Sequence, residues 1–260
     1  MSALLALAPR PTARRSDPSS MPDFSVILPA AGSSSRFGGP VSKLFQPLAG
    51  LPVLAWTVRA FAARNDVPQI VIPSHDRPAV EQSLQTLPQS QQEKILICPG
   101  GDCRAGSVHA GIEASLKDIE WIAVHDAARP LVSSELIDRV LAAAVIHGAA
   151  AAAMPAHLTI KQAAGPLPAR VQRTIPRRDL WAMQTPQIAR RADYLRCFAT
   201  CPVPLAEVTD DMQLLELQDL PVWLVQGEER NLKITTPTDI SLADLWSRSL
   251  VPSPGTPGEG

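Results

Sequence analysis

Small residues and two cations follow the first apolar run of the chain. Residues 28–54 read LPAAGSSSRFGGPVSKLFQPLAGLPVL, and the positions that could do chemistry are Ala30, Ala31, Gly32, Arg36 and Lys43. Small side chains let backbone N–H groups approach a phosphate, whose charge nearby cations neutralise. The spacing matches neither the P-loop pattern nor the dinucleotide-binding glycine pattern. It predicts a phosphate site of another kind or, taken alone, a tight turn with two solvated cations.

Four later stretches place polar residues at or after the ends of apolar runs. They read PGGDCRAGSV (99–108), VHDAARPLV (124–132), TPQ (185–187) with TDD (209–211), and NLKIT (231–235). These stretches offer few aspartates and no dense acidic cluster. Mg²⁺ is commonly held by one or two carboxylates together with substrate phosphates. The pattern therefore fits a metal held mainly by the phosphates of a substrate, and the four cysteines and five histidines lack zinc-type spacing.

These stretches must be positioned by a series of alternating elements. Strands are expected at 24–29, 69–73, 94–98, 121–126, 150–154, 181–187, 221–226 and 231–235. Helices are expected at 52–64, 77–87, 104–117, 133–148, 189–199, 209–218 and 237–249. Serial strand–helix–strand order implies crossover connections and a mostly parallel sheet with helices on both faces.

The alternation is interrupted at residues 157–175, HLTIKQAAGPLPARVQRTI. Two short alternating runs flank a Gly-Pro-Leu-Pro turn, which predicts a β-hairpin arm over about 156–177. Its exposed apolar positions need a partner, and a second copy of the chain is the simplest one.

Composition limits the function classes. The 260 residues carry 24 Lys+Arg against 25 Asp+Glu, so no broad basic field is available for nonspecific nucleic-acid binding. No apolar run approaches the roughly 20 residues that cross a bilayer. We therefore expect a cytoplasmic protein that acts on small molecules, with neither nucleic acid nor membrane as partner.

The two ends are expected to be disordered. In residues 1–22 the arginines follow a short apolar run, the reverse of a secretory signal. An extension is favoured over a targeting peptide. Residues 250–260 are rich in Pro and Gly and are predicted to be a solvated tail. One structured domain, 23–249, remains between them.

Other conspicuous side chains have a structural interpretation. His125 lies beside Asp126 in an apolar strand, where neighbouring side chains face opposite ways, so a packed, hydrogen-bonded histidine is favoured over a general base. The cysteines at 197 and 201 and the five tryptophans are predicted to be core residues.

Together the motifs resemble the 2-C-methyl-D-erythritol 4-phosphate cytidylyltransferases of the non-mevalonate isoprenoid pathway. The first loop reads L-P-A-A-G-x-x-x-R-(x)6-K, and VHDAARP ending a strand is the most specific element. The resemblance covers about residues 24–246. It implies a Rossmann-like nucleotidyltransferase fold and transfer of CMP from CTP to 2-C-methyl-D-erythritol 4-phosphate, with Mg²⁺ or another divalent cation and a homodimer formed through the arm.

The resemblance also implies roles for individual residues. The catalytic positions are Arg36, Lys43, Asp126 and Lys233. The CTP-binding positions are Ala30, Ala31, Gly32, Gly101, Asp102, Ser107, Ala127 and Arg129. The acceptor-binding positions are Thr159, Arg177, Thr185 and Thr209. Asp126 is the possible metal ligand, directly or through water.

Two departures from the family pattern and two alternative functions accompany this assignment. Asp211 stands where the family generally has glutamate, and three serines occupy the first loop where glycine is frequent. A cytidylyltransferase for ribitol 5-phosphate or another polyol phosphate would share the nucleotide half. A noncatalytic nucleotide-binding regulator is disfavoured because the chain has all four catalytic positions, and a dehydrogenase because the glycine pattern is absent.

Overall fold

The computed structural model describes residues 21–32 and 42–248. The predictions for the two ends, and for Arg36 with the three serines of the first loop, fall mainly or wholly outside this part. The strands are β1 (Phe24–Ile27), β2 (Pro47–Leu48), β3 (Leu51–Pro52), β4 (Gln69–Ser74), β5 (Ile95–Pro99), β6 (Trp121–Val124), β7 (Ala149–Pro155), β8 (Ile160–Ala163), β9 (Val171–Ile175), β10 (Trp181–Arg190) and β11 (Trp223–Gln226).

The helices occupy the intervals between strands. They are α1 (Val53–Ala62), α2 (Arg77–Leu84), α3 (Gln89–Gln92), α4 (Arg104–Ala114), α5 (Ser134–His147), α6 (Arg191–Ala199), α7 (Asp211–Glu216) and α8 (Pro237–Arg248), with the short 3₁₀ turns η2 (Lys43–Phe45) and η3 (Leu205–Glu207). None of the described helices is long and apolar enough to span a bilayer.

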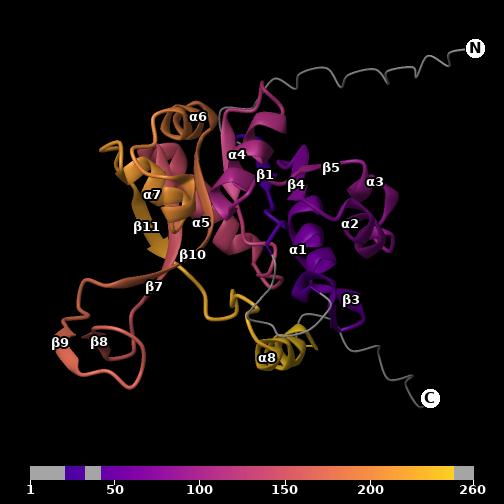
Figure 1. Cartoon of the computed structure of the whole chain (residues 1–260). Coiled ribbons are helices and arrows are strands. Elements are labelled where there is room, and N and C mark those ends of the chain that lie inside the picture. The colour runs from indigo at the N-terminus through magenta and orange to yellow at the C-terminus, as the bar shows by residue number, and fades with distance from the viewer. Residues whose placement is uncertain (1–20, 33–41, 249–260) are drawn as a thin grey trace, which may run out of the picture.

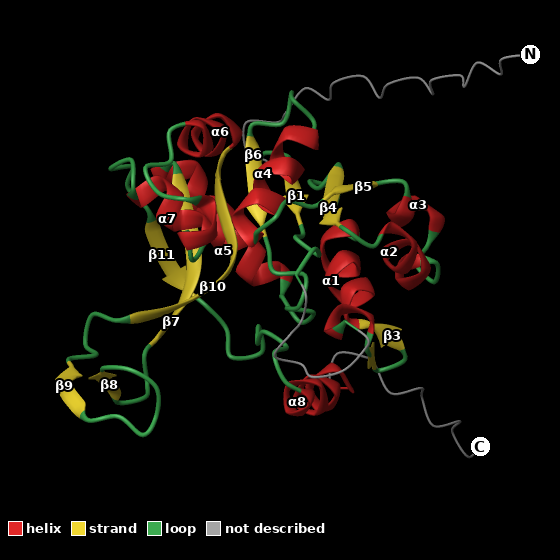
Figure 2. Ribbon diagram, in the orientation of Figure 1, coloured by secondary structure: helices red, strands yellow, loops and turns green. Residues whose placement is uncertain are grey.

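A seven-stranded sheet forms the centre of the molecule, in the order β11-β7-β10-β6-β1-β4-β5 (Figures 1 and 2). β1 pairs in parallel with both β4 and β6, and β4 pairs in parallel with β5. Only β10 runs antiparallel to its neighbours, β6 and β7, within this sheet. The mostly parallel sheet predicted from the sequence is confirmed.

Strand side chains alternate between two hydrophobic cores. In β6, Trp121 and Ala123 pack on one side, while Ile122 and Val124 pack on the other. The first core contains the apolar faces of α1, α2 and α5, and the second contains those of α4, α6 and α7. Since both faces are covered, the central strands are apolar at nearly every position, which explains their continuous hydrophobic runs.

The longest helix begins and ends where the sequence predicts. Ser133 is the N-cap of α5, and its hydroxyl accepts a hydrogen bond from the backbone N–H of Leu136 at 3.0 Å. Gly148 closes the helix with φ of 94°, a conformation that glycine adopts without strain.

The predicted β-hairpin arm is confirmed. β8 and β9 pair antiparallel, and the hairpin projects from the ends of β7 and β10 (Figure 1). Leu158 and Leu167 are 82% and 87% exposed within the chain. Because these apolar side chains are exposed, they are available to a partner. A two-stranded hairpin is marginally stable alone in water, so contact with a partner would also stabilise it.

Two expectations are wrong. Residues 231–235 form no strand: the Ile234 N–H donates to the carbonyl of Ala128, so the segment crosses the strand ends and joins no sheet edge. Trp181 and Trp223 are also surface residues, 44% and 42% exposed. Trp223 lies on β11, an edge strand, where its ring stacks on His147 at 4.3 Å.

Candidate active site

A pocket of about 480 Å³ lies beyond the carboxyl ends of the parallel strands. Residues that follow β1, β4, β5 and β6 line it: Pro29, Ala30, Ala31, Gly32, His75, Gly101, Asp102, Cys103, Arg104, Ser107, Asp126, Ala127 and Ala128, together with Lys43, Leu44, Lys233 and Thr235. The chain places β4 and β5 on one side of β1 and then crosses to β6 on the other. Such a switch point in an open parallel sheet is where ligands bind.

One wall of the pocket requires glycine. A Cβ added to Gly100 would lie 2.5 Å from the Cβ of Ala31, and one added to Gly101 would lie 2.5 Å from the backbone carbon of Gly106. The Gly101 N–H donates to the Ser107 hydroxyl at 3.0 Å. The turn after β5 therefore packs tightly against both the first loop and the start of α4.

Asp126 lies at the centre of the charged part of the pocket. Its Oδ2 is 3.0 Å from Lys233 Nζ and 3.0 Å from Arg129 Nε, and its Oδ1 is 3.5 Å from an Arg104 nitrogen. Burial opposes ionisation of this carboxyl, but the three cations outweigh burial and hold its pKa well below the usual range. Asp126 is therefore a carboxylate at neutral pH.

Arg104 is shared between two carboxylates. Its two terminal nitrogens donate to the oxygens of Asp211 at 3.0 and 2.7 Å, a two-pronged pairing, while the same side chain faces Asp126. Asp211 is completely buried. Burial raises the pKa of Asp211, and the charge of Arg104 only partly offsets this rise. Burial of Arg104 would lower its pKa, but the carboxylates of Asp211 and Asp126 outweigh burial and raise it.

Lys43 and Lys233 are brought to the pocket by segments 190 residues apart in sequence. The Lys43 ammonium donates to the carbonyl of Ile234 at 2.7 Å, next to Lys233. Arg129 fixes the start of the same segment by donating to the carbonyl of Asn231 at 2.7 Å. The irregular segment 231–235 thus links the first loop to the end of β6.

A buried chain of hydrogen bonds, on the side of Asp126 away from the pocket, holds the backbone of Asp126 in place. Because a carbonyl can only accept, His125 Nε2 donates to the Arg129 carbonyl at 3.1 Å, and the neutral ring then accepts at Nδ1 from the Thr185 hydroxyl at 3.0 Å. That hydroxyl accepts in turn from the Asp126 N–H at 3.0 Å. The prediction that His125 is a packed, hydrogen-bonded histidine is confirmed.

Most of the predicted site residues converge on this pocket. Its lining contains Ala30, Ala31, Gly32, Lys43, Gly101, Asp102, Ser107, Asp126, Ala127 and Lys233. Arg129 pairs with Asp126 at the edge of this lining. Thr185, predicted to bind the acceptor, is instead buried behind Asp126 and is not part of the lining, because its hydroxyl is engaged by His125 and by the Asp126 N–H.

The remaining acceptor-side residues lie away from the lining. Thr159 and Arg177 are exposed in the arm region, and the Arg177 guanidinium donates to the carbonyl of His157. Thr209 is exposed just before α7, where it hydrogen-bonds the Gln213 side chain. Within one chain, these three residues do not join the pocket.

Several polar residues of the site were missed from the sequence. Arg104 stands inside a recognised motif, yet nothing local signals that it binds two carboxylates. Asn231 is wholly buried, and its amide donates to the Thr185 carbonyl at 2.7 Å and to Gln184 at 3.2 Å. For Asn231 the available signal was its place in the run 231–235, where polar residues alternate with apolar ones.

Within residues 21–32 and 42–248, no group of three His, Cys, Asp or Glu side chains could hold a metal ion. The pocket does offer Asp102 and Asp126 as separate carboxylates. This donor set suits a hard divalent cation that takes most of its ligands from phosphate oxygens and water.

The switch-point pocket, its close-packed glycine turn and its cations around a single carboxylate define the chain as a nucleotidyltransferase. The family model described as 2-C-methyl-D-erythritol 4-phosphate cytidylyltransferase (IspD) matches residues 24–249. The chain belongs to this family.

Relatives and solved structures agree. The 2-C-methyl-D-erythritol 4-phosphate cytidylyltransferase of Symbiobacterium thermophilum is 42% identical over 221 residues, covering 85% of this chain and 91% of that protein. A bifunctional IspD/IspF enzyme of Desulfotalea psychrophila is 39% identical over 230 residues, which cover 88% of this chain and 58% of that protein.

Among solved structures, the 2-C-methyl-D-erythritol 4-phosphate cytidylyltransferase of Thermus thermophilus superposes with a TM-score of 0.70 at 32% identity. The match covers 87% of this chain and 99% of that one.

Proposed function

We propose that this enzyme transfers CMP from CTP to 2-C-methyl-D-erythritol 4-phosphate, releasing pyrophosphate and forming 4-diphosphocytidyl-2-C-methyl-D-erythritol. Membership of a cytidylyltransferase family supports the reaction. The observation that carries the proposal is the pocket itself, whose lining at the switch point of the sheet combines Lys43, Lys233 and the ionised Asp126, with Lys233 paired to Asp126. None of the comparisons above supports the ribitol 5-phosphate alternative.

The reaction needs charge neutralisation and alignment. An acceptor phosphate oxygen, already ionised at neutral pH, forms a bond to the α-phosphorus of CTP. The bond from that phosphorus to the bridging oxygen breaks, and pyrophosphate leaves with the electron pair. No general base is required, so the protein contributes positioning and electrostatic stabilisation.

The proposed catalytic cations are Lys43, Lys233 and Arg36. Lys43 is held by the carbonyl of Ile234 and Lys233 by Asp126, so both ammonium groups are oriented before substrate arrives. Preorganised charges of this kind stabilise negative charge that develops in the transition state. Arg36, outside the described residues, is assigned to the triphosphate from the first-loop motif.

The nucleotide half is assigned to the small residues of the pocket. Ala30, Ala31 and Gly32 present backbone where a phosphate can approach, and Gly101 and Asp102 from the turn after β5, with Ser107 from α4, line the same pocket. Ala127 and Arg129, at the end of β6, complete the proposed CTP site. Thr185, which the resemblance assigns to the acceptor, would act on the acceptor indirectly, through the hydrogen bond that it accepts from the Asp126 N–H.

The acceptor is proposed to bind with help from a second subunit. Thr159 and Arg177 are exposed in the arm region, which also carries the exposed Leu158 and Leu167. A homodimer in which the arm reaches the neighbour's pocket would cover these leucines and add a cation for the acceptor phosphate. Thr209, just before α7, is also assigned to acceptor binding.

A divalent cation is proposed as cofactor. Asp126 would hold it, directly or through water, with the remaining ligands from CTP phosphates. When bound, the ion would neutralise triphosphate charge and favour departure of pyrophosphate. The cytoplasmic location remains a prediction of the sequence.

Pyrophosphate release from CTP and a panel of polyol phosphates tests the function. Methylerythritol phosphate should be the preferred acceptor, and ribitol 5-phosphate should turn over at least tenfold more slowly. Equal rates with both acceptors, or none with either, would overturn the assignment.

A further inference from the structure

The two oxygens of Asp126 differ in their environment. Oδ2 contacts both Lys233 and Arg129 at 3.0 Å. Oδ1 faces Arg104 across 3.5 Å, and none of the hydrogen bonds in the described part of the chain ends on it. Both Asp126 and Arg104 line the pocket. Oδ1 is therefore the oxygen available to a bound nucleotide or its ion.

Asp211 determines where the Arg104 guanidinium lies. Its carboxylate takes both terminal nitrogens of Arg104, at 3.0 and 2.7 Å. Arg–carboxylate hydrogen bonds of this two-pronged kind have a fixed geometry. Arg104 lies 3.0 and 2.7 Å from the oxygens of Asp211 but 3.5 Å from Oδ1 of Asp126. The guanidinium is therefore 0.5 to 0.8 Å farther from Asp126 than from Asp211.

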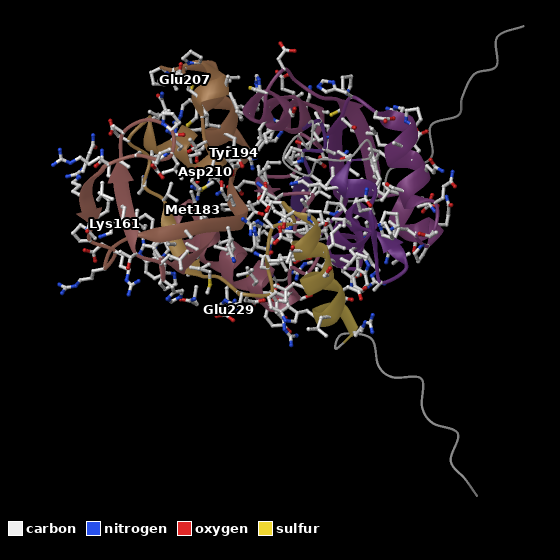
Figure 3. The ribbon with its side chains drawn as sticks, turned by 60° about the horizontal axis from the view of Figure 1, so that its bottom comes forward. Lys161, Met183, Tyr194, Glu207, Asp210 and Glu229 are labelled. Carbon is white, nitrogen blue, oxygen red and sulfur yellow. The ribbon has the colours of Figure 1, made fainter. Side chains whose placement is uncertain are left out.

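Asp211 is itself rigidly held. The side chain of Gln187, in the sheet, accepts from the backbone N–H groups of Asp211 and Met212 at 3.0 and 3.2 Å. The neighbouring Asp210 caps α7 by accepting from the Gln213 N–H. Figure 3 shows Asp210 near Tyr194, between the arm marked by Lys161 and the indigo half of the chain. Because its backbone is held in this way, Asp211 can compete with Asp126 for Arg104, although its side chain is one methylene shorter than the glutamate general in the family.

We propose that Asp211 is a positioning residue that restrains Arg104 and so leaves Asp126 Oδ1 open toward the substrate. Without the Asp211 carboxylate, Arg104 would close the 3.5 Å gap and occupy Oδ1. The expected changes in kcat and KM rest on the proposed function of the pocket. The competition of Asp211 and Asp126 for Arg104 does not, because it concerns only side chains of this protein.

The test is a set of three variants in the full chain: Asp211→Asn, Arg104→Met and the double variant. Asp211→Asn preserves shape and should lower kcat at least tenfold, with a smaller change in KM for CTP. Removing the released guanidinium should reverse this loss, so the double variant should turn over at least threefold faster than Asp211→Asn. Glu120→Gln, which breaks the exposed pair with Arg190, is the matched control and should leave both constants unchanged.

A purely structural role predicts a different result. If the pair only stabilised the fold, the double variant would be no more active than Asp211→Asn, and this outcome would overturn the proposal. A crystal structure of Asp211→Asn supplies a readout that is independent of activity. The gap between Arg104 and Asp126 should close from 3.5 Å to about 2.8 Å, the length of a charge-assisted hydrogen bond.

An unchanged gap in that crystal structure would also refute the restraint. Thermal melts of all variants exclude unfolding as the cause of lost turnover. If the wild-type enzyme itself fails to use CTP and methylerythritol phosphate, the proposed function falls, while the crystallographic distance still decides the restraint.

Discussion

Replacement of His125 by glutamine should flatten the pH dependence of stability. Burial lowers the pKa of His125 to about 4, although its bond to the Arg129 carbonyl and the charge of Asp126 act in the opposite direction. The ring also packs edge-on against Phe61, with centroids 5.0 Å apart. The folded protein therefore keeps this histidine neutral at pH values where the unfolded chain, with a pKa near 6.5, protonates it.

The direction and size of the effect follow from proton linkage. Between pH 6.5 and 4 the unfolded chain binds more protons at this site than the folded one, so the free energy of unfolding falls as the pH falls. A folded pKa of about 4 against 6.5 corresponds to a loss of about 2 kcal/mol between pH 7 and pH 5.

The assay is urea denaturation of wild type and His125→Gln at pH 7 and pH 5. The variant should be less stable at pH 7, because it disturbs the bonds to Arg129 and Thr185, but its loss on going to pH 5 should be about 2 kcal/mol smaller. His157→Gln, at an exposed position in the arm region, is the control and should keep the wild-type difference. An undiminished difference in His125→Gln would refute the reasoning.

Three further predictions concern the reaction. Lys43→Ala should fold normally and lose about 3 to 4 kcal/mol of transition-state stabilisation; near wild-type turnover in steady-state kinetics would contradict the role of Lys43. Asp126→Asn should need more Mg²⁺ and turn over more slowly, since an amide binds the ion weakly, and an unchanged metal titration would show that Asp126 does not meet it. Replacing residues 160–172 with a Gly-Ser bridge should give a monomer that binds CTP in calorimetry but does not use the acceptor. A deletion protein that sediments as a dimer, or a monomer with normal turnover, would remove the proposed role of the arm.

The sequence alone predicted the mostly parallel sheet, and its motifs with their family resemblance indicated much of the pocket lining. Continuous apolar runs alternating with helical stripes predict a parallel sheet, and polar residues after such runs lie at its carboxyl edge because parallel strands end together. Lys43 was found among the cations of the first loop, whereas Asp126 and Gly101 were assigned through the family resemblance of their motifs. The packed, hydrogen-bonded character of His125 was predicted from strand alternation, whereas its neutrality follows from its burial in the folded chain.

The tertiary structure decided which charged side chains, distant in sequence, pair with one another. Arg104 and Asp211 are 107 residues apart, and no sequence period relates them. The segment 231–235 has an apolar pattern typical of a strand, yet its backbone bonds to the loop after β6 and carries Lys233 across the strand ends. Local patterns report only which face of an element is buried, whereas the pairing of buried charges depends on how separate elements pack. That is the reason the restraint proposed for Arg104 is visible only in the folded chain.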